Sequence, residues 1–114
     1  MKILIYLTAF LFFFSFAGAK EKNVSIKSTK PIVIDVRTEA EFNAGNIQGS
    51  VLIPFDVINT KIAEITTDKS AKIILYCRSG RRSGIAESVL KEMGYVNVEN
   101  YGSMQSTKEK LEIK

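Results

Sequence analysis

Short apolar runs alternate with polar segments of helical spacing along most of the chain. Runs of β-branched and aliphatic residues at positions 32–34, 51–53 and 73–76 predict buried strands, and residues 96–99 predict a last one. Strands that alternate with helices through short connections are typical of βαβ units. We therefore expect an α/β protein with a small, mostly parallel sheet flanked by helices on both faces.

Capping residues set the expected boundaries of the first two helices. Thr38 and Glu41 have the spacing of a capping box, which predicts a helix that begins at Glu39 and is stopped by Gly45. Asp56 is expected to cap the second helix, because an aspartate before an apolar-periodic segment can accept from the first free amides. The buried face of that helix would carry Val57, Ile58, Ile62 and Ile65.

Two further helices are predicted in the C-terminal half. Gly94 ends the first of them, whose apolar positions recur at helical spacing and comprise Ile85, Val89, Leu90 and Met93. Ser106 and Glu109 repeat the capping-box spacing and predict a shorter helix near the C-terminus.

The first 19 residues have the order of a secretory signal peptide. Lys2 precedes an apolar run over residues 3–16, and the small triplet Ala17-Gly18-Ala19 follows it. A retained membrane anchor is the alternative, but a spanning helix needs about 20 apolar residues. We expect cleavage after Ala19 and export, most simply to the periplasm. The mature protein is then expected to have no stable association with the membrane.

The remaining chain has room for one domain. Residues 20–30 form a polar leader with a short edge strand expected at 24–26, and residues 31–114 form the domain. Removing Lys2 from the 16 basic residues leaves 15 against 12 acidic ones, a net charge of +3. Because this charge is scattered outside one loop, a nucleic-acid partner is not expected.

The cysteine and histidine content restricts the chemistry. The chain has one cysteine, Cys77, and no histidine. This excludes Ser-His-Asp and Cys-His catalysis and disfavours a zinc site, so no metal is expected. There is no cofactor motif either. An odd cysteine in an exported protein indicates a reactive thiol or an intermolecular pair.

The loop after Cys77 could activate its thiol without an imidazole. Cys77 follows a buried strand and precedes a helix, so loop amides, the helix N-terminus and nearby arginines would favour a thiolate. The alternative is an inert, buried cysteine, but three arginines and a glycine follow at once, which a core position would not tolerate. We predict Cys77 as the catalytic residue and, as substrate-binding residues, Arg78, Ser79, Gly80, Arg81, Arg82 and Ser83.

This segment resembles the active-site loop of the rhodanese sulfurtransferases, whose pattern is Cys-x-x-Gly-x-Arg followed by a small residue. Three further segments resemble that family in order and spacing: the strand ending in Asp35-Val36-Arg37, the stretch from Glu41-Phe42 to Gly49, and the strand leading to Ile53-Pro54. The match runs from about residue 31 to 102, and a single domain behind a signal peptide is most similar to the small exported members.

The chain departs from the family pattern at a few positions. Asn46 stands where the family often has histidine and Gln48 where proline is common, and the C-terminal Gly-Gly and tryptophan are absent. The resemblance implies that Asp35 and Arg37 are structural and hold neighbouring loops by hydrogen bonds. Glu41 is expected to be a helix cap.

The resemblance implies a sulfurtransferase that moves sulfur from a small anionic donor such as thiosulfate to a thiol or cyanide, through a Cys77 persulfide. We expect a monomer that acts without a cofactor. Two alternatives remain open. One is a phosphatase or arsenate reductase, whose loops place arginine at the sixth position after cysteine, where this chain has Ser83. The other is a non-catalytic persulfide carrier or partner-binding module.

Overall fold

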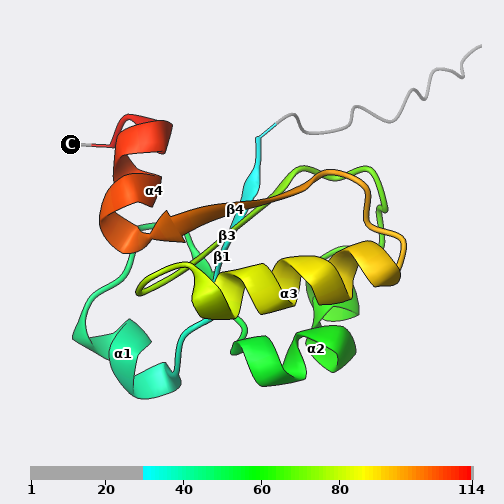
Figure 1. Cartoon of the computed structure of the whole chain (residues 1–114), viewed down its shortest axis with the longest axis horizontal. Coiled ribbons are helices and arrows are strands. Elements are labelled where there is room, and N and C mark those ends of the chain that lie inside the picture. Colours follow the sequence, from blue (N-terminus) through cyan, green and yellow to red (C-terminus); the bar gives the residue numbers. More distant parts are fainter. Residues whose placement is uncertain (1–29, 114) are drawn as a thin grey trace, which may run out of the picture.

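The computed structural model describes residues 30–113, which form a four-stranded parallel sheet with helices packed against it (Figure 1). The strand order is β2-β1-β3-β4, and each pair of neighbouring strands is parallel. The predicted α/β class is confirmed. The strands are β1 (Ile32–Asp35), β2 (Val51–Leu52), β3 (Ile73–Cys77) and β4 (Val98–Ser103).

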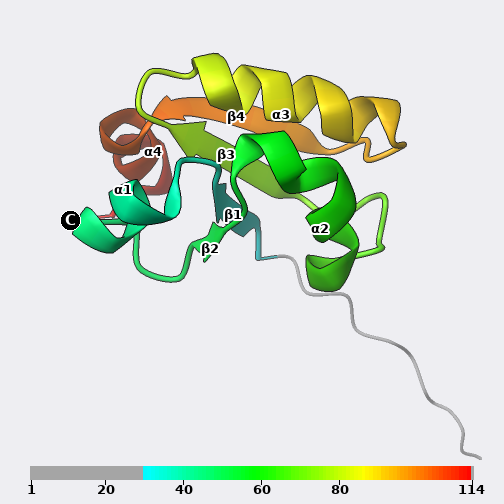
Figure 2. The same cartoon turned by 90° about the horizontal axis from the view of Figure 1, so that it is seen from below.

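Helices cover both faces of this sheet, as the alternating pattern predicted. Helices α2 and α3 lie together on one side, and α4 packs against β4 and β3 on the other (Figures 1 and 2). The α-helices are α1 (Glu39–Ala44), α2 (Ile58–Ile65), α3 (Arg81–Glu92) and α4 (Met104–Leu111), and a 3₁₀ turn, η3 (Phe55–Val57), precedes α2.

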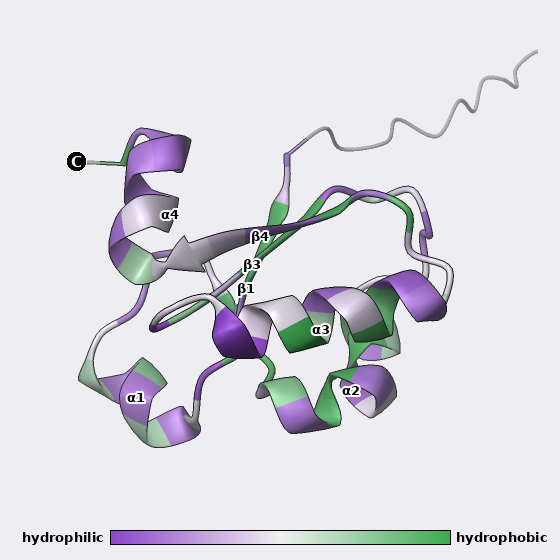
Figure 3. Cartoon of the chain, in the orientation of Figure 1, coloured by the Kyte–Doolittle hydropathy of each residue, from purple (hydrophilic) through white to green (hydrophobic). Residues whose placement is uncertain are grey.

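Strand β3 is the centre of the core, because all five of its residues are buried. Successive side chains of a strand point to opposite faces. Ile73, Leu75 and Cys77 join the apolar cluster under α2 and α3, which includes Ile62 and Leu90. Figure 3 shows the green, hydrophobic segments along these inner surfaces. Each fully buried aliphatic side chain contributes about 1.5–3 kcal/mol, so this layer fixes how α3 sits on the sheet.

The first helix begins and ends where its sequence predicted. The Glu41 amide donates to Thr38 Oγ1 at 3.2 Å, and the Thr38 amide donates to Glu41 Oε1 at 3.0 Å, which completes the capping box. Gly45 occupies the C-cap position. This boundary was predictable because a capping box uses only atoms within four residues of each other.

The start of the second helix was predicted wrongly. Asp56 lies inside η3, and the N-cap position of α2 is Val57, which makes no side-chain capping bond. The Val57 amide donates to the Pro54 carbonyl, which closes a 3₁₀ turn that contains Asp56 and leaves this residue one position too early to be the N-cap of α2. Ile58 and Ile62 are buried as expected, but Ile65 is 38 % exposed.

The apolar face of α3 is also rotated from its predicted position. Leu90 is buried as expected, but Ile85 is 40 % exposed, and Ser83 and Ala86 take the positions nearest the sheet. Small side chains allow the start of α3 to approach the sheet closely. The spacing of large apolar residues did not predict that these small residues would be buried.

The last strand and the C-terminal helix also differ from the expectation. Val96 is 75 % exposed and precedes β4, whose range follows from its pairing with β3. Helix α4 begins two residues before Ser106, because the side chain of Ser103 caps it by accepting the Ser106 amide at 3.0 Å. The expected strand at 24–26 lies outside the described residues. Within residues 30–113, no helix is long and apolar enough to cross a membrane.

Candidate functional site

Cys77 is the last residue of β3, at the carboxyl edge of the sheet where α/β proteins bind ligands. Its side chain is only 1 % exposed and belongs to the apolar cluster under α3. The expectation that the following arginines exclude a buried position is therefore wrong. The chain turns sharply after Cys77, so the arginines reach away from the core while the sulfur stays at its rim.

Two polar groups contact the buried sulfur. The Gly80 amide donates to Cys77 Sγ at 3.0 Å, and the Ser83 hydroxyl lies 3.4 Å from it. Burial by itself raises the pKa of the Cys77 thiol. Hydrogen bonds with Ser83 and with the backbone amides of Gly80 and Ser79 outweigh burial and lower this pKa to about 7. This distinguishes Cys77 from an inert core cysteine.

Gly80 makes this arrangement possible through its backbone. Its φ is +99°, a left-handed conformation that glycine adopts without steric cost, and it is the N-cap residue of α3. Its carbonyl accepts the Gly84 amide at 2.9 Å and so begins the helix. The same residue therefore turns its amide toward the sulfur and its carbonyl into α3.

The three arginines of the loop have different surroundings. Arg82 forms two hydrogen bonds with the Glu41 carboxylate, at 2.9 and 3.1 Å. Arg78 is 74 % exposed and lies 3.8 Å from the same carboxylate, whereas Arg81 is exposed and pairs with none of the described residues. The hydrogen bonds with Ser83, Gly80 and Ser79 lower the pKa of Cys77 more than the charges of these arginines do.

Asn100 is a site residue that the sequence analysis missed. Its side chain contacts both groups that contact the sulfur: Oδ1 accepts from the Ser83 hydroxyl at 2.7 Å, and Nδ2 donates to the Gly80 carbonyl at 2.9 Å. The one available signal was a polar residue two positions after the apolar Val98, on the same face of a strand.

A comparison with known proteins identifies this arrangement. The sequence model of the rhodanese-like domain matches residues 19–110. The chain belongs to the rhodanese-like domain family. The family resemblance drawn from the cysteine loop and its three companion segments is confirmed.

Similar proteins include named sulfurtransferases. This rhodanese-like protein is 39 % identical over 72 residues to the thiosulfate sulfurtransferase PspE of Escherichia coli, covering 63 % of this chain and 69 % of PspE. It is 36 % identical over 69 residues to a sulfurtransferase of Allochromatium vinosum, covering 60 % of this chain and 63 % of that protein. A solved E. coli rhodanese with anions superposes with a TM-score of 0.65 at 36 % identity, covering 68 % of this chain and 91 % of that one.

The buried charged pair at the end of β1 is structural, as predicted. Asp35 and Arg37 are buried, and the Arg37 guanidinium donates to both carboxylate oxygens at 2.6–3.0 Å. Arg37 Nη2 also donates to the Gly45 carbonyl at 2.7 Å, which ties the end of β1 to the end of α1. Asn46 donates to the Phe42 carbonyl at 2.8 Å, so it too supports α1.

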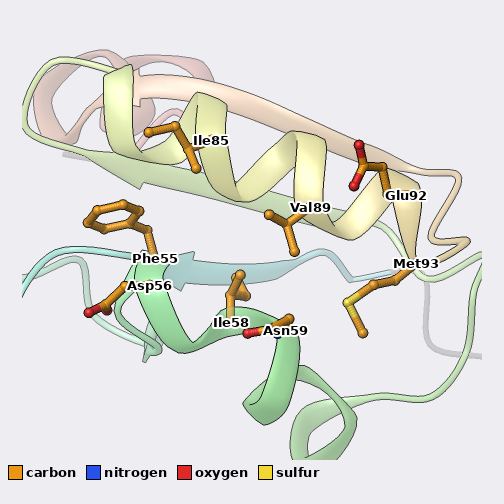
Figure 4. Close-up of a pocket in the computed structure, with 8 residues that line it drawn as sticks. All are labelled: Phe55, Asp56, Ile58, Asn59, Ile85, Val89, Glu92 and Met93. Atoms are coloured by element: carbon orange, nitrogen blue, oxygen red, sulfur yellow. The ribbon is translucent and has the colours of Figure 1, made fainter.

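An apolar groove lies between η3, α2 and α3 (Figure 4). Its volume is about 590 Å³, and its lining comprises Phe55, Asp56, Ile58, Asn59, Ile85, Val89, Glu92 and Met93. None of the predicted site residues lines it. Residues 30–113 contain no cluster of side chains suited to hold a metal ion.

Proposed function

We propose that this rhodanese-like protein is a sulfurtransferase in which Cys77 carries sulfur from thiosulfate, or a similar small anionic donor, to a thiol or cyanide. The observation that carries the proposal is the Gly80 amide, 3.0 Å from Cys77 Sγ. An amide directed at a lone thiol at the start of a helix stabilises a sulfur anion. The names of the relatives in Escherichia coli and Allochromatium vinosum support a sulfur-transfer reaction.

The proposed reaction consists of two nucleophilic displacements at sulfur. The Cys77 thiolate attacks the outer sulfur of thiosulfate, an S–S bond forms, and the bond to the departing group breaks so that sulfite leaves with its electron pair. An acceptor thiolate or cyanide then attacks the outer sulfur of the persulfide. The products are an acceptor persulfide or thiocyanate, and the Cys77 thiolate is restored. Two successive displacements predict ping-pong kinetics.

Each loop residue has a role in this proposal. The amides of Ser79, Gly80 and Ser83 stabilise the sulfur anion. Arg78 and Arg81 are exposed at the rim and attract an anionic donor. Arg82 joins the loop to α1 through Glu41.

The pair between Arg82 and Glu41 argues against phosphatase chemistry. A phosphatase loop needs a guanidinium free to hold the phosphate oxygens, but Nη1 and Nη2 of Arg82 both donate to the Glu41 carboxylate. The shorter loop also suits a single sulfur atom. A persulfide carrier without turnover remains the second candidate, since the same amides would stabilise a stored persulfide.

We also propose that the protein is exported and monomeric, and that it acts without a cofactor or a nucleic-acid partner. Residues 1–19 would be a signal peptide, residues 20–30 a leader and residues 31–114 the single domain. The charged start, apolar run and Ala17-Gly18-Ala19 support export, and the periplasm is the compartment that we propose.

A thiosulfate:cyanide assay of the mature protein and its Cys77→Ser variant tests this function. Thiocyanate should form with ping-pong kinetics in the wild type and at least a thousandfold more slowly in the variant. Exposed Ser88 on α3 provides the control, and Ser88→Ala should keep the wild-type rate. Equal rates with and without Cys77 would remove the residue from the mechanism.

Two further measurements separate the alternatives. A mass increase of one sulfur atom after thiosulfate treatment, with negligible release to cyanide or thiols, would support the carrier instead. Rapid hydrolysis of an aryl phosphate would support the phosphatase.

A further inference from the structure

Asn100 holds the Cys77 loop from the neighbouring strand. Its side chain makes three hydrogen bonds: Oδ1 accepts from the Ser83 hydroxyl at 2.7 Å and from the Gly102 amide at 2.8 Å, and Nδ2 donates to the Gly80 carbonyl at 2.9 Å. Gly80 and Ser83 each place a polar atom within 3.4 Å of Cys77 Sγ. One side chain therefore restrains two partners of the sulfur.

The orientation of this amide is determined by its backbone partners. Turning it over would set Nδ2 against the Gly102 N–H and Oδ1 against the Gly80 carbonyl, two repulsive pairs. Since Oδ1 only accepts, the Ser83 hydroxyl donates its proton to Asn100. The lone pairs of Ser83 Oγ are then available to the thiol.

The local backbone makes room for this side chain. The pairing of β3 with β4 shifts between Leu75 and Tyr76, whose partners are Asn100 and Gly102, so β4 carries one extra residue, Tyr101. Such a bulge redirects the strand at the point where Asn100 bonds to the Gly102 amide. On the helix side, a Cβ at Gly84 would lie 3.4 Å from Asn100 Nδ2, so the amide packs beside the first turn of α3.

We propose that Asn100 is a positioning residue for the sulfur-transfer reaction, because its amide fixes the Gly80 carbonyl and the Ser83 hydroxyl so that both residues stay directed at the sulfur of Cys77. This inference rests on the proposed function. Asn100 does not touch the reacting atoms and acts through Gly80 and Ser83. Its loss should change how readily Cys77 ionises, which a purely structural residue distant from the loop would not do.

Two effects of opposite sign follow from replacing Asn100 by leucine. Removal of Oδ1 frees the Ser83 proton for the sulfur, which favours the thiolate. Loss of both restraints loosens the segment whose three amides, from Ser79, Gly80 and Ser83, lower the pKa of Cys77. We expect three loosened donors to outweigh one freed proton, so the pKa should rise by about one unit and thiolate at pH 7 should fall about fivefold.

The test is the pH dependence of iodoacetamide alkylation of Cys77 in Asn100→Leu. The inflection should rise by about one unit, while the plateau rate above about pH 10 stays within about twofold of the wild type. Asn97→Leu is the matched control, because Asn97 is exposed just before β4 and its side chain makes no bond with the described residues. It should leave the inflection unchanged.

The outcome is decisive in either direction. An unchanged or lowered inflection in Asn100→Leu would overturn the proposal, and so would an equal shift in Asn97→Leu. Circular dichroism checks the fold, and if the leucine variant does not fold, Asn100→Ala is measured with the same expectation. Alkylation requires no sulfur donor, so a wild type that fails to make thiocyanate would disprove the proposed function while this test of Asn100 still stands.

Discussion

Arg82 donates two hydrogen bonds to the carboxylate of Glu41, at 2.9 and 3.1 Å, and so joins the start of α3 to α1 across 41 residues of sequence. The bonds from Arg82, with those from Thr38, lower the pKa of Glu41 to about 2. Glu41 therefore serves both the capping box of α1 and the arginine of the cysteine loop. The positive charge of Arg82 is largely neutralised before any donor arrives.

Glu41→Gln should reduce the free energy of unfolding by about 1–2 kcal/mol at pH 7, because it removes the charge from a two-bond pair. The folded pKa of Glu41 lies below its ordinary value of 4.5, so this stability is present above pH 4.5 and is lost as pH falls toward 2. Urea unfolding at several pH values measures it. Glu39→Gln, in the same exposed helical turn, should cost less than about 0.5 kcal/mol. Equal losses in both variants would contradict the assignment.

The reactivity of Cys77 should depend on pH with an inflection near 7, because hydrogen bonds lower the pKa of its thiol to about 7. Iodoacetamide alkylation followed by mass spectrometry gives the rate at each pH. The folded pKa is below the ordinary value of 9.0, so stability should rise as pH increases from about 7 to 9, and this contribution should disappear as pH falls through 7. An inflection at 8.5 or above would show an ordinary thiol.

Gly80→Ala should reduce both stability and thiol reactivity. At a φ of +99° an alanine costs about 1–2 kcal/mol, and the strain falls on the amide that donates to the sulfur. Gly49→Ala is the control, since Gly49 has a similar φ of +89° with open space around it. Both variants should lose similar stability in urea, and only Gly80→Ala should slow alkylation of Cys77 at pH 7. Equal alkylation rates in the two variants would show that the Gly80 amide does not promote the reactivity of Cys77.

Asp35→Asn should destabilise the protein without changing the chemistry of Cys77. The carboxylate of Asp35 is buried and accepts from the amide and guanidinium of Arg37, so removing its charge leaves an arginine without its counterion. We expect a loss of about 3 kcal/mol in urea unfolding. The alkylation inflection should stay at the wild-type pH. Exposed Asp56→Asn should change neither quantity, and a shifted inflection in Asp35→Asn would give Asp35 a role at the site.

Local features of the fold were predictable because they depend on neighbours in the sequence. The capping box of Thr38 and Glu41 and the buried run of β3 were found in this way. The predicted cap at Asp56 was wrong because this residue lies inside a 3₁₀ turn, and Val57 takes the N-cap position of α2. The predicted range of β4 was wrong because pairing with β3, and not the apolar run alone, determines where the strand begins and ends.

The sequence alone determined the class of fold, the family and the single sulfur on which the proposed chemistry depends, since these follow from periodicity, composition and motifs within short segments. Only the tertiary structure decided which groups surround that sulfur. Glu41 and Asn100 lie far from Cys77 in sequence, and packing brings one to Arg82 and the other to Gly80 and Ser83. Such bonds depend on how strands and helices pack, which no spacing along the chain records.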